Sequence, residues 1–343
     1  MNAEAEQSEE AGPDIVASVL AWVDAGHGAA LATVIKTWGS SPCPAGSMLA
    51  VRDDNAFLGS VSAGCIEGEV VTEALAAIRN DGFRILDFGV SNEAAWQAGL
   101  ACGGQVRVAV ANISPDRLAV LRRLQDARAS KSPAVLITEL DEGGTIFHAP
   151  DGDPSPSGTL AAEITQRLTG DRSGIVEADG AAGRFVHVFN PPLRLFIVGA
   201  VHIAQALSRI AAEAGYDVTV IDPRDTWGTV ERFPGVRLDR RWPSAALEAA
   251  ALDARSAVVT LCHDPKLDDP ALLVAVKSDA FYIGSLGSRR THAKRLERLR
   301  AEGVGDTELQ RVHGPVGLDI GAQTPAEIAV ATMAQLTAAL RAR

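Results

Sequence analysis

Four segments of the sequence could bind a charged ligand, and the most informative is a glycine turn followed by an acid. Residues 193–204 read as a strand, the turn at Gly199 and a helix, and residues 216–222 read as a second strand. Asp222 ends that strand 23 residues after Gly199, about the spacing between a dinucleotide-type glycine turn and a ribose-binding acid. The pattern predicts that Asp222 accepts hydrogen bonds from a ribose and that Arg224 binds a phosphate.

One residue departs from the dinucleotide fingerprint. Val201 stands where the fingerprint has its second glycine, and a β-branched side chain there crowds a bound pyrophosphate. His202 follows and could face a ligand or simply sit at the start of the helix. We therefore expect a Rossmann-like fold without ordinary NAD(P) chemistry, and a turn that binds no ligand remains an alternative.

The segment Thr260-Leu-Cys-His-Asp264 places a thiol, an imidazole and a carboxylate in succession. Adjacent residues rarely face one another, so a direct dyad of Cys262 and His263 is not expected. We expect His263 or Asp264 to face the pocket and Cys262 to be a small, buried, apolar residue.

The strongest predicted anion site is Gly284-Ser-Leu-Gly-Ser-Arg-Arg-Thr291, between a strand and a helix. Glycines such as Gly284 expose backbone N–H groups, and the helix start adds positive potential. Ser285 lies in the same turn, and Arg289 and Arg290 could clamp a phosphate. The alternative, a solvated basic helix start, runs against the preference of the helix dipole.

Three cysteines, Cys43, Cys65 and Cys102, lie in loops rich in glycine or proline. Such thiols are accessible and near backbone N–H groups that stabilise a thiolate, and Glu67 or Glu69 could add a carboxylate. Three loop positions favour a functional role. A closed zinc site is an alternative, but the paired cysteine spacing of such sites is absent.

The elements that must position these groups divide the chain into two domains after an acidic tail. We expect residues 1–11 to be disordered, 12–190 to form an α+β domain, and 191–343 to form a Rossmann-like α/β domain. The Asn-Pro-Pro run at 190–192 marks the boundary.

Beyond that boundary strands alternate with helices, which is typical of a doubly wound parallel sheet. The expected strands are 195–198, 218–221, 236–238, 257–261, 281–283 and one near 311–312. Thr324-Pro-Ala-Glu327 is a capping box that begins the last helix.

The N-terminal domain is predicted to consist mainly of strands and glycine loops. Its expected helices are 13–25, one that ends near 78, and 117–129. Its expected strands are 30–36, 47–52, 57–61, 83–88, 105–111, 135–138, 145–148 and 183–189.

Composition excludes several classes of protein. The 343 residues carry 32 Lys and Arg against 43 Asp and Glu, a net charge of −11, so nucleic-acid binding is not expected. The acidic N-terminus lacks the apolar core of a signal peptide, and charges interrupt the apolar runs short of a membrane span. The four cysteines form no CxxC pair, so we expect reduced thiols and a cytoplasmic protein.

Together these loops resemble the XdhC/CoxI family of maturation factors for molybdenum hydroxylases such as xanthine dehydrogenase and carbon monoxide dehydrogenase. The resemblance covers nearly the whole chain. The run at 314–322 is not a motif shared by many protein families, so it makes the resemblance specific. The matching segments are Thr33-Val-Ile-Lys-Thr-Trp-Gly-Ser-Ser-Pro, Gly59-Ser-Val-Ser-Ala-Gly-Cys-Ile-Glu-Gly68, Cys102-Gly-Gly104, Tyr282-Ile-Gly-Ser-Leu-Gly-Ser-Arg-Arg-Thr291 and Gly314-Pro-Val-Gly-Leu-Asp-Ile-Gly-Ala322.

The resemblance implies a carrier more than a catalyst. Such a protein would bind the molybdenum cofactor, as molybdopterin or its cytosine dinucleotide form, while a cysteine desulfurase helps to install a sulfido ligand. It would then pass the cofactor to the apo form of a molybdenum hydroxylase. Cys65 and Cys102 would lie at the molybdenum or sulfur end, and Ser285, Arg289 and Arg290 at the phosphate end.

Asp222 would serve a nucleotide if the cofactor carries one. The full set of residues expected to bind the cofactor is Cys65, Glu67, Cys102, Gly103, Gly104, Gly199, His202, Asp222, Arg224, His263, Gly284, Ser285, Arg289, Arg290 and Asp319.

Two other functions remain open. An NAD(P)-dependent oxidoreductase would need a binding site for the pyrophosphate, which Val201 obstructs. It would also need a proton-transfer group, for which His263 is the obvious candidate. A sulfurtransferase would act through a persulfide on Cys102 or Cys65 and could coexist with the carrier role. A homodimer is a further expectation on general grounds.

Overall fold

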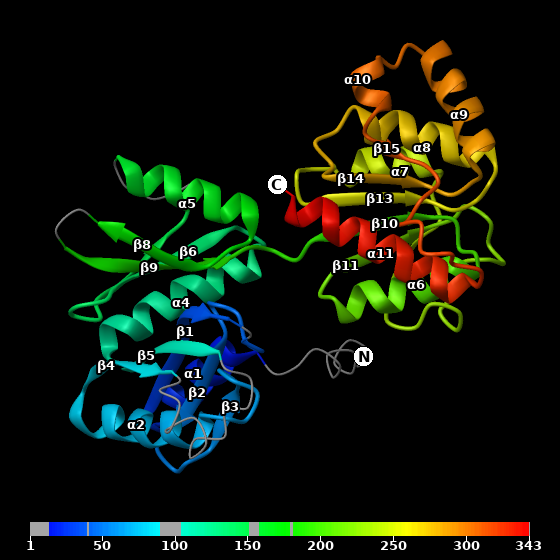
Figure 1. Ribbon diagram of the computed structural model, residues 1–343. Helices are drawn as coiled ribbons and strands as arrows, with labels where there is room; N and C mark the ends of the chain where they lie inside the picture. Colours follow the sequence, from blue (N-terminus) through cyan, green and yellow to red (C-terminus); the bar gives the residue numbers. More distant parts are fainter. Residues whose placement is uncertain (1–13, 40, 90–103, 151–157, 179–180, 343) are drawn as a thin grey trace. The chain divides into compact units, whose positions relative to one another are not determined.

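The computed structural model describes residues 14–39, 41–89, 104–150, 158–178 and 181–342 (Figure 1). It divides into two compact units, unit 1 over Met1–Pro191 and unit 2 over Pro192–Arg343. The acidic tail at 1–11 lies outside the described residues.

Unit 1 contains a five-stranded antiparallel sheet in the order β3-β2-β1-β5-β4. Its strands are β1 (Ala29–Trp38), β2 (Met48–Arg52), β3 (Phe57–Gly59), β4 (Phe83–Phe88) and β5 (Gln105–Asn112). Helix α2 (Glu67–Asn80) buries Val70, Ala74 and Ala77 in a core with residues of β1, β2 and β5. Helices α1 (Ile15–Asp24) and α4 (Pro115–Ala129) contribute to a separate core with other residues of β1 and β2.

A second sheet of unit 1 has four antiparallel strands in the order β7-β6-β9-β8. They are β6 (Ala134–Glu139), β7 (Thr145–His148), β8 (Gly174–Ala178) and β9 (Ala181–Phe189), and helix α5 (Thr159–Gly170) packs on them. Neither α5 nor β8 is among the elements predicted above. The signal for α5 is present, because Leu160, Ile164 and Leu168 recur every four residues and pack into this core.

Unit 2 is built on a six-stranded parallel sheet in the order β12-β11-β10-β13-β14-β15. The strands are β10 (Arg194–Val198), β11 (Asp217–Ile221), β12 (Arg237–Asp239), β13 (Ser256–Thr260), β14 (Tyr282–Ser285) and β15 (Val312–His313). This is the doubly wound order of the Rossmann fold. The predicted α/β fold class is confirmed, with the strand bounds within about two residues of those expected.

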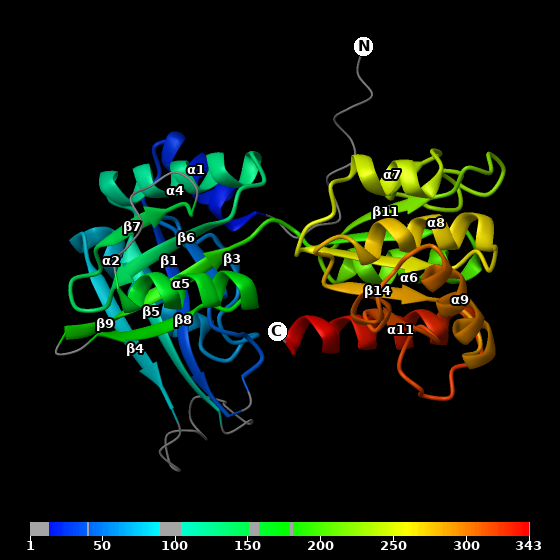
Figure 2. The same ribbon diagram turned by 90° about the horizontal axis from the view of Figure 1, so that it is seen from above.

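Helices cover both faces of the unit 2 sheet (Figures 1 and 2). Helices α6 (His202–Glu213) and α11 (Pro325–Arg341) contribute to one core, and α7 (Pro243–Ala249), α8 (Pro265–Val276) and α9 (Arg289–Ala301) to the other. The short α10 (Asp306–Leu309) precedes β15. The capping box of α11 forms as predicted, since Thr324 accepts from the Glu327 N–H and Glu327 from that of Thr324.

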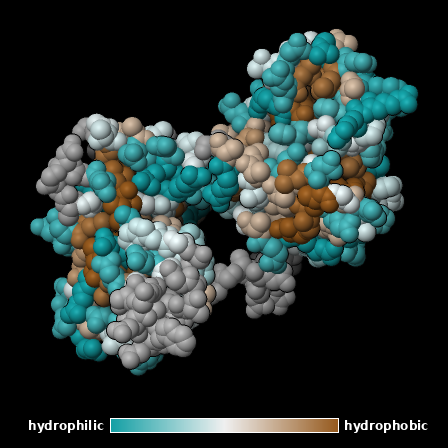
Figure 3. Space-filling model, viewed as in Figure 1, coloured by the Kyte–Doolittle hydropathy of each residue, from teal (hydrophilic) through white to brown (hydrophobic). Residues whose placement is uncertain are grey.

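The carboxyl ends of the parallel strands lie along one edge of this sheet, where ligands bind in doubly wound folds. The loops after β10, β11, β13 and β14 all begin there. Figure 3 shows that hydrophobic areas on the visible surface of each unit alternate with hydrophilic ones. No helix within the described ranges is long and apolar enough to cross a membrane.

Candidate functional site

The turn after β10 is shaped by its contact with the loop after β13. Gly199 has a φ of +106°, and a Cβ there would lie 2.6 Å from the Cys262 sulfur and 3.1 Å from the Cys262 backbone nitrogen. Only glycine combines this backbone conformation with so close an approach. Gly199 is therefore required by packing against Cys262, whether or not a ligand binds.

Replacing Gly199 by alanine should lower the free energy of unfolding by about 2–4 kcal/mol. The strain of a positive φ and the steric overlap with Cys262 both destabilise the folded protein. Gly215 is the matched control, since it has a φ of +82° and nothing within 4 Å of a built Cβ. Gly215→Ala should therefore cost only about 1 kcal/mol. Urea unfolding of the two variants measures the difference, and equal losses would contradict a role for the Cys262 contact.

Asp222 lies at the end of β11, but its carboxylate is already used within the protein. One oxygen accepts from the Ala200 N–H at 2.8 Å and from Arg224 Nη2 at 2.7 Å, and the other from the Arg224 N–H and Nε at 3.0 and 2.8 Å. Burial alone would raise the pKa of Asp222, yet these hydrogen bonds hold the pKa below its usual value.

Asp222 and Arg224 bind each other, whereas the sequence predicts that Asp222 binds a ribose and Arg224 a phosphate. The Asp222 side chain is 1% exposed and all four of its lone-pair positions are occupied, so a ribose would have to displace Arg224. The Arg224 guanidinium is paired with Asp222 and lies 4.1 Å from the centre of the Trp227 ring. The pair fixes the turn after β10 rather than presenting a free acid and a free cation.

The other groups expected near this turn differ in their burial and contacts. Val201 occupies the N-cap position of α6 without a side-chain hydrogen bond, and His202 follows it, exposed. Cys262 is half-buried, and burial raises the pKa of its thiol. Asp264 caps α8 by accepting from the Lys266 N–H, while His263 is exposed and lines a pocket. Cys262 thus packs against the core of unit 2, although it is half-buried where the sequence predicts a buried residue.

Gly284 and Ser285, the first two residues of the predicted anion site, are the last two residues of β14 and differ from the expectation. Ser285 is fully buried and its hydroxyl pairs with that of Thr260 at 2.5 Å, so it is not open to a ligand. Gly284 is also buried, and a Cβ there would meet Val316 at 2.7 Å and the Tyr282 hydroxyl at 2.8 Å. Both residues are therefore packing positions of β14, Ser285 against Thr260 and Gly284 against Val316.

Arg289 and Arg290 line different pockets, whereas the sequence predicts that they bind one phosphate together. Ser288 caps α9, so the two arginines are its first and second residues, and successive side chains on a helix point about 100° apart. Arg289 lies beside Asp319, with 3.6 Å between their charged groups, and both side chains are 88% exposed. The pocket there has a volume of about 400 Å³, and its lining includes the apolar side chains of Leu286, Pro315, Val316, Leu318, Ile320 and Ile328.

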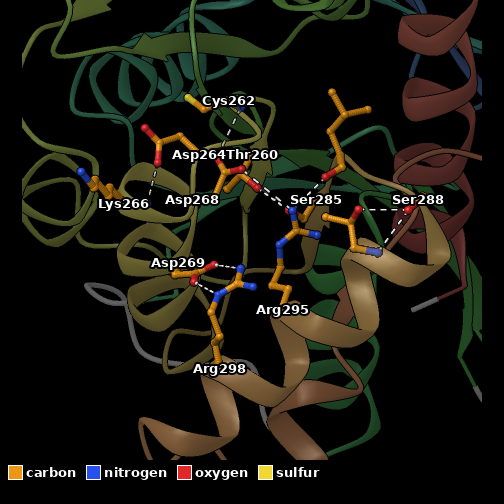
Figure 4. Close-up of polar contacts among 12 residues, drawn as sticks. Thr260, Cys262, Asp264, Lys266, Asp268, Asp269, Ser285, Ser288, Arg295 and Arg298 are labelled. Carbon is orange, nitrogen blue, oxygen red and sulfur yellow. Dashed lines mark hydrogen bonds and ion pairs between the residues drawn. The ribbon is translucent and has the colours of Figure 1, made fainter.

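Arg290 lines a second pocket, between α8 and α9, which we call the cationic pocket. Its volume is about 150 Å³, and it is lined by His263, Pro265, Asp268, Arg290, Thr291, Lys294, Arg295 and Arg298. Figure 4 shows Arg295 and Arg298 extending from α9 toward Asp268 and Asp269. Asp269 accepts two hydrogen bonds from Arg298, at 2.5 and 2.9 Å.

Asp268 and Arg295 form a buried pair at the base of the cationic pocket. Both side chains are 2% exposed, and 3.9 Å separates Arg295 Nη2 from Asp268 Oδ2. Arg295 Nη2 donates to the Leu286 carbonyl, but Asp268 Oδ2 and Arg295 Nε and Nη1 have no hydrogen-bond partner among the described residues. Burial raises the pKa of Asp268 to about 6, against the opposing effect of Arg295.

Only two residues of the cationic pocket, His263 and Arg290, are predicted from the sequence. A helical signal exists for two more, because Arg290, Lys294 and Arg298 recur every four residues and so share one face. Asp268 and Arg295 are 27 positions apart, and only the fold brings them together.

In unit 1 the loop around Cys65 is organised by Glu67. The Glu67 carboxylate accepts from the hydroxyls of Ser60 and Ser62 at 2.7 and 2.5 Å. It also accepts from four backbone N–H groups, those of Val61, Ser62, Gly64 and Ile66. Glu67 therefore holds the loop in place, and these hydrogen bonds occupy both oxygens of the carboxylate that the sequence assigns to the cofactor.

Cys65 is the exposed thiol of this loop. It follows Ala63 and Gly64, whose φ angles are +59° and +109°, and its N–H donates to the Ser62 hydroxyl at 3.0 Å. Cys43 is half-buried, with its sulfur 3.8 Å from the Ser60 hydroxyl. The loop thus presents the Cys65 thiol at the surface.

The other sequence-predicted residues of unit 1 lie at 102–104. Cys102 and Gly103 are outside the described residues, and Gly104 is buried just before β5. Among the residues that the structure describes, no three His, Cys, Asp or Glu side chains are grouped so that they could hold a metal ion.

Both units match models of known protein families. Residues 195–336 match the XdhC Rossmann domain, and residues 22–89 match the XdhC and CoxI family. The Escherichia coli molybdenum cofactor insertion chaperone PaoD is 29% identical over 314 residues, which cover 91% of this chain and 83% of that protein. A Bacillus subtilis protein named as a probable xanthine dehydrogenase subunit is 26% identical, covering 90% of this chain and 92% of that protein.

A solved structure has the same fold. It is a crystal structure of a xanthine dehydrogenase from Bacillus halodurans, 23% identical, with a TM-score of 0.75 over 96% of this chain and 97% of that one.

Proposed function

This chain belongs to the XdhC/CoxI family, and from that membership we propose that it is a maturation factor for a molybdenum hydroxylase. It binds the molybdenum cofactor and delivers it to an apo-enzyme of the xanthine dehydrogenase or CO dehydrogenase type. The observation that carries the proposal is the similarity along 91% of the chain to a molybdenum cofactor insertion chaperone. The Bacillus subtilis relative, named for xanthine dehydrogenase, supports a partner of that class.

Two features of the described residues support a carrier of this kind of cargo. The cofactor has a molybdenum bound by sulfur at one end and a phosphate at the other. The cationic pocket of unit 2 has the charge to hold a phosphate. Taken by itself, the exposed Cys65 thiol of unit 1 is a soft ligand suited to molybdenum or its sulfur ligand. The cargo is molybdopterin or its cytosine dinucleotide form.

In the finer form of the proposal, the chain holds the cofactor while a cysteine desulfurase supplies sulfur, and it acts before insertion. Among the described residues, Cys65 is then the one that we place at the metal end. The fixed loop supports this role, because Glu67 and Ser62 hold the backbone on either side of the thiol and leave the sulfur itself exposed.

An NAD(P)-dependent oxidoreductase gains no support within the described residues. The acid expected to bind a ribose, Asp222, already accepts four hydrogen bonds from Ala200 and Arg224. The observed contacts of the β10 turn therefore weigh against this alternative.

Anaerobic titration of the full chain with isolated molybdenum cofactor tests the proposal. The wild type should bind, and Cys65→Ser should weaken binding about 10-fold, or ~1.4 kcal/mol. Cys43→Ser, at the half-buried thiol, is the matched control and should change affinity less than twofold. No binding of the cofactor by the wild type, with binding of NADH in a parallel titration, would reject the carrier in favour of an oxidoreductase.

A further inference from the structure

We infer that the cationic pocket between α8 and α9 binds a phosphoryl dianion, and that Arg290, Lys294 and Arg295 hold it while Arg289 does not. The assignment of that group to the phosphate of the molybdenum cofactor rests on the proposed function. The phosphoryl site itself rests only on the contacts of unit 2.

The first support is a buried cation whose hydrogen-bonding capacity is unused. Arg295 lines the pocket with 2% of its side chain exposed, and its Nε and Nη1 have no partner among the described residues. A buried guanidinium normally has its N–H groups satisfied, because leaving them unpaired costs free energy. Oxygens of a ligand seated in the pocket would supply acceptors.

The second support is the charge around the pocket. Arg298 is neutralised by the two hydrogen bonds from its guanidinium to Asp269. Within the described part of the chain, Arg290, Lys294 and Arg295 then face a single lining carboxylate, that of Asp268. Three cations against one carboxylate leave two positive charges, which match the charge of about −1.5 to −2 on a phosphomonoester at pH 7.

The third support is the start of α9, where Arg290 and Thr291 are the second and third residues of a 13-residue helix. The Thr291 N–H donates to the Ser288 hydroxyl at 3.1 Å, so the helix start contributes its partial positive charge and not that N–H group. A Rossmann domain usually binds a phosphate at the equivalent position after β10. In this chain the Ala200 N–H at that position donates to Asp222 instead. We therefore place the anion site of unit 2 beside the loop after β14 and not at the loop after β10.

The size of the pocket limits what it can hold. At about 150 Å³ it is smaller than the roughly 300 Å³ or more of a site for a whole small ligand. It accommodates one charged group, and the remainder of the ligand lies outside it.

Calorimetric titration of the full chain with inorganic phosphate, CMP and cytidine tests the inference. Phosphate and CMP should bind and cytidine should not, and tighter binding of CMP than of phosphate would indicate a nucleotide source for the group. Arg290→Gln and Lys294→Gln should each weaken CMP binding about 10-fold. Arg289→Gln is the matched control, an exposed neighbour on the same helix turn, and should change affinity less than twofold.

Equal losses in Arg289→Gln and Arg290→Gln, or failure of both phosphate and CMP to bind, would overturn the inference. A parallel titration with the molybdenum cofactor separates it from the proposed function. Normal cofactor binding by Arg290→Gln would reject the assignment of the pocket to the phosphate of the cofactor and leave the carrier intact. Phosphate binding with the expected pattern of variants, but no cofactor binding, would reject the carrier and leave the pocket.

Discussion

Glu67→Gln should lower the free energy of unfolding at pH 7 by about 2 kcal/mol and disorganise the loop that carries Cys65. The carboxylate accepts hydrogen bonds from four backbone N–H groups and two hydroxyls. An amide replaces one acceptor oxygen by a donor, so several of those groups lose their partner. The expected loss is below the full value of these bonds because the side chain is partly open to solvent.

The pH dependence of this effect follows from the pKa of Glu67. Burial would raise that pKa, but the hydrogen bonds from Ser60 and Ser62 lower it from 4.5 to about 2. A carboxyl with a lowered folded pKa stabilises the protein above its unfolded pKa, and the benefit is lost as the pH falls from about 4.5 to 2. The gap between wild type and Glu67→Gln should therefore shrink across that range.

Glu69→Gln is the matched control, because Glu69 is exposed one half-turn along the same helix. It should change stability by less than about 0.5 kcal/mol. Urea unfolding at pH 7 and pH 3.5 measures both variants. A Glu67→Gln protein as stable as Glu69→Gln at pH 7 would show that the carboxylate does not hold the loop.

Arg295→Met should destabilise the full chain by about 3–5 kcal/mol at pH 7, because it leaves the buried Asp268 carboxylate without its cation. The guanidinium also donates to the Leu286 carbonyl, and methionine cannot. Arg300→Met is the control. Arg300 lies on the same helix with 56% of its side chain exposed beside Asp306, and such surface pairs contribute about 0–1 kcal/mol.

Asp268 supplies a second readout of the same pair. Its folded pKa of about 6 lies above the ordinary 3.8, so its ionisation costs stability as the pH rises from about 4 through 6. Removing Arg295 removes the influence that lowers this pKa, and the deficit of Arg295→Met should therefore be larger at pH 7 than at pH 5. The double variant Asp268→Asn/Arg295→Met should recover part of the loss. A deficit that is independent of pH would contradict the pairing.

Much of the fold of unit 2 could be predicted because each of its elements carries a local signal. Its buried strands are mostly continuous apolar runs, and the capping box of Thr324 and Glu327 predicts the start of the last helix. In unit 1 the helix α5 is missing from the predicted elements, although its four-residue apolar repeat is a helical signal. β8 has no such signal, since Gly174–Ala178 is short and, among the described strands, pairs only with β9.

The site was harder to predict because its contacts are tertiary. A sequence in which Arg224 follows Asp222 by two residues is equally compatible with an acid open to a ribose and with an internal ion pair. Only the approach of the Ala200 N–H to the carboxylate decides between them. Likewise, Arg289 and Arg290 separate into two pockets only once Ser288 fixes the start of α9.

The most direct test of the central claim is transfer of the cargo. The full chain, loaded anaerobically with molybdenum cofactor, is mixed with a xanthine-dehydrogenase-type hydroxylase in its apo form, and the recovered hydroxylase activity is compared with that from the same amount of free cofactor. A maturation factor should give at least several-fold more activity than free cofactor, and Cys65→Ser should give less than the wild type. Equal activity with and without the chain would contradict the account.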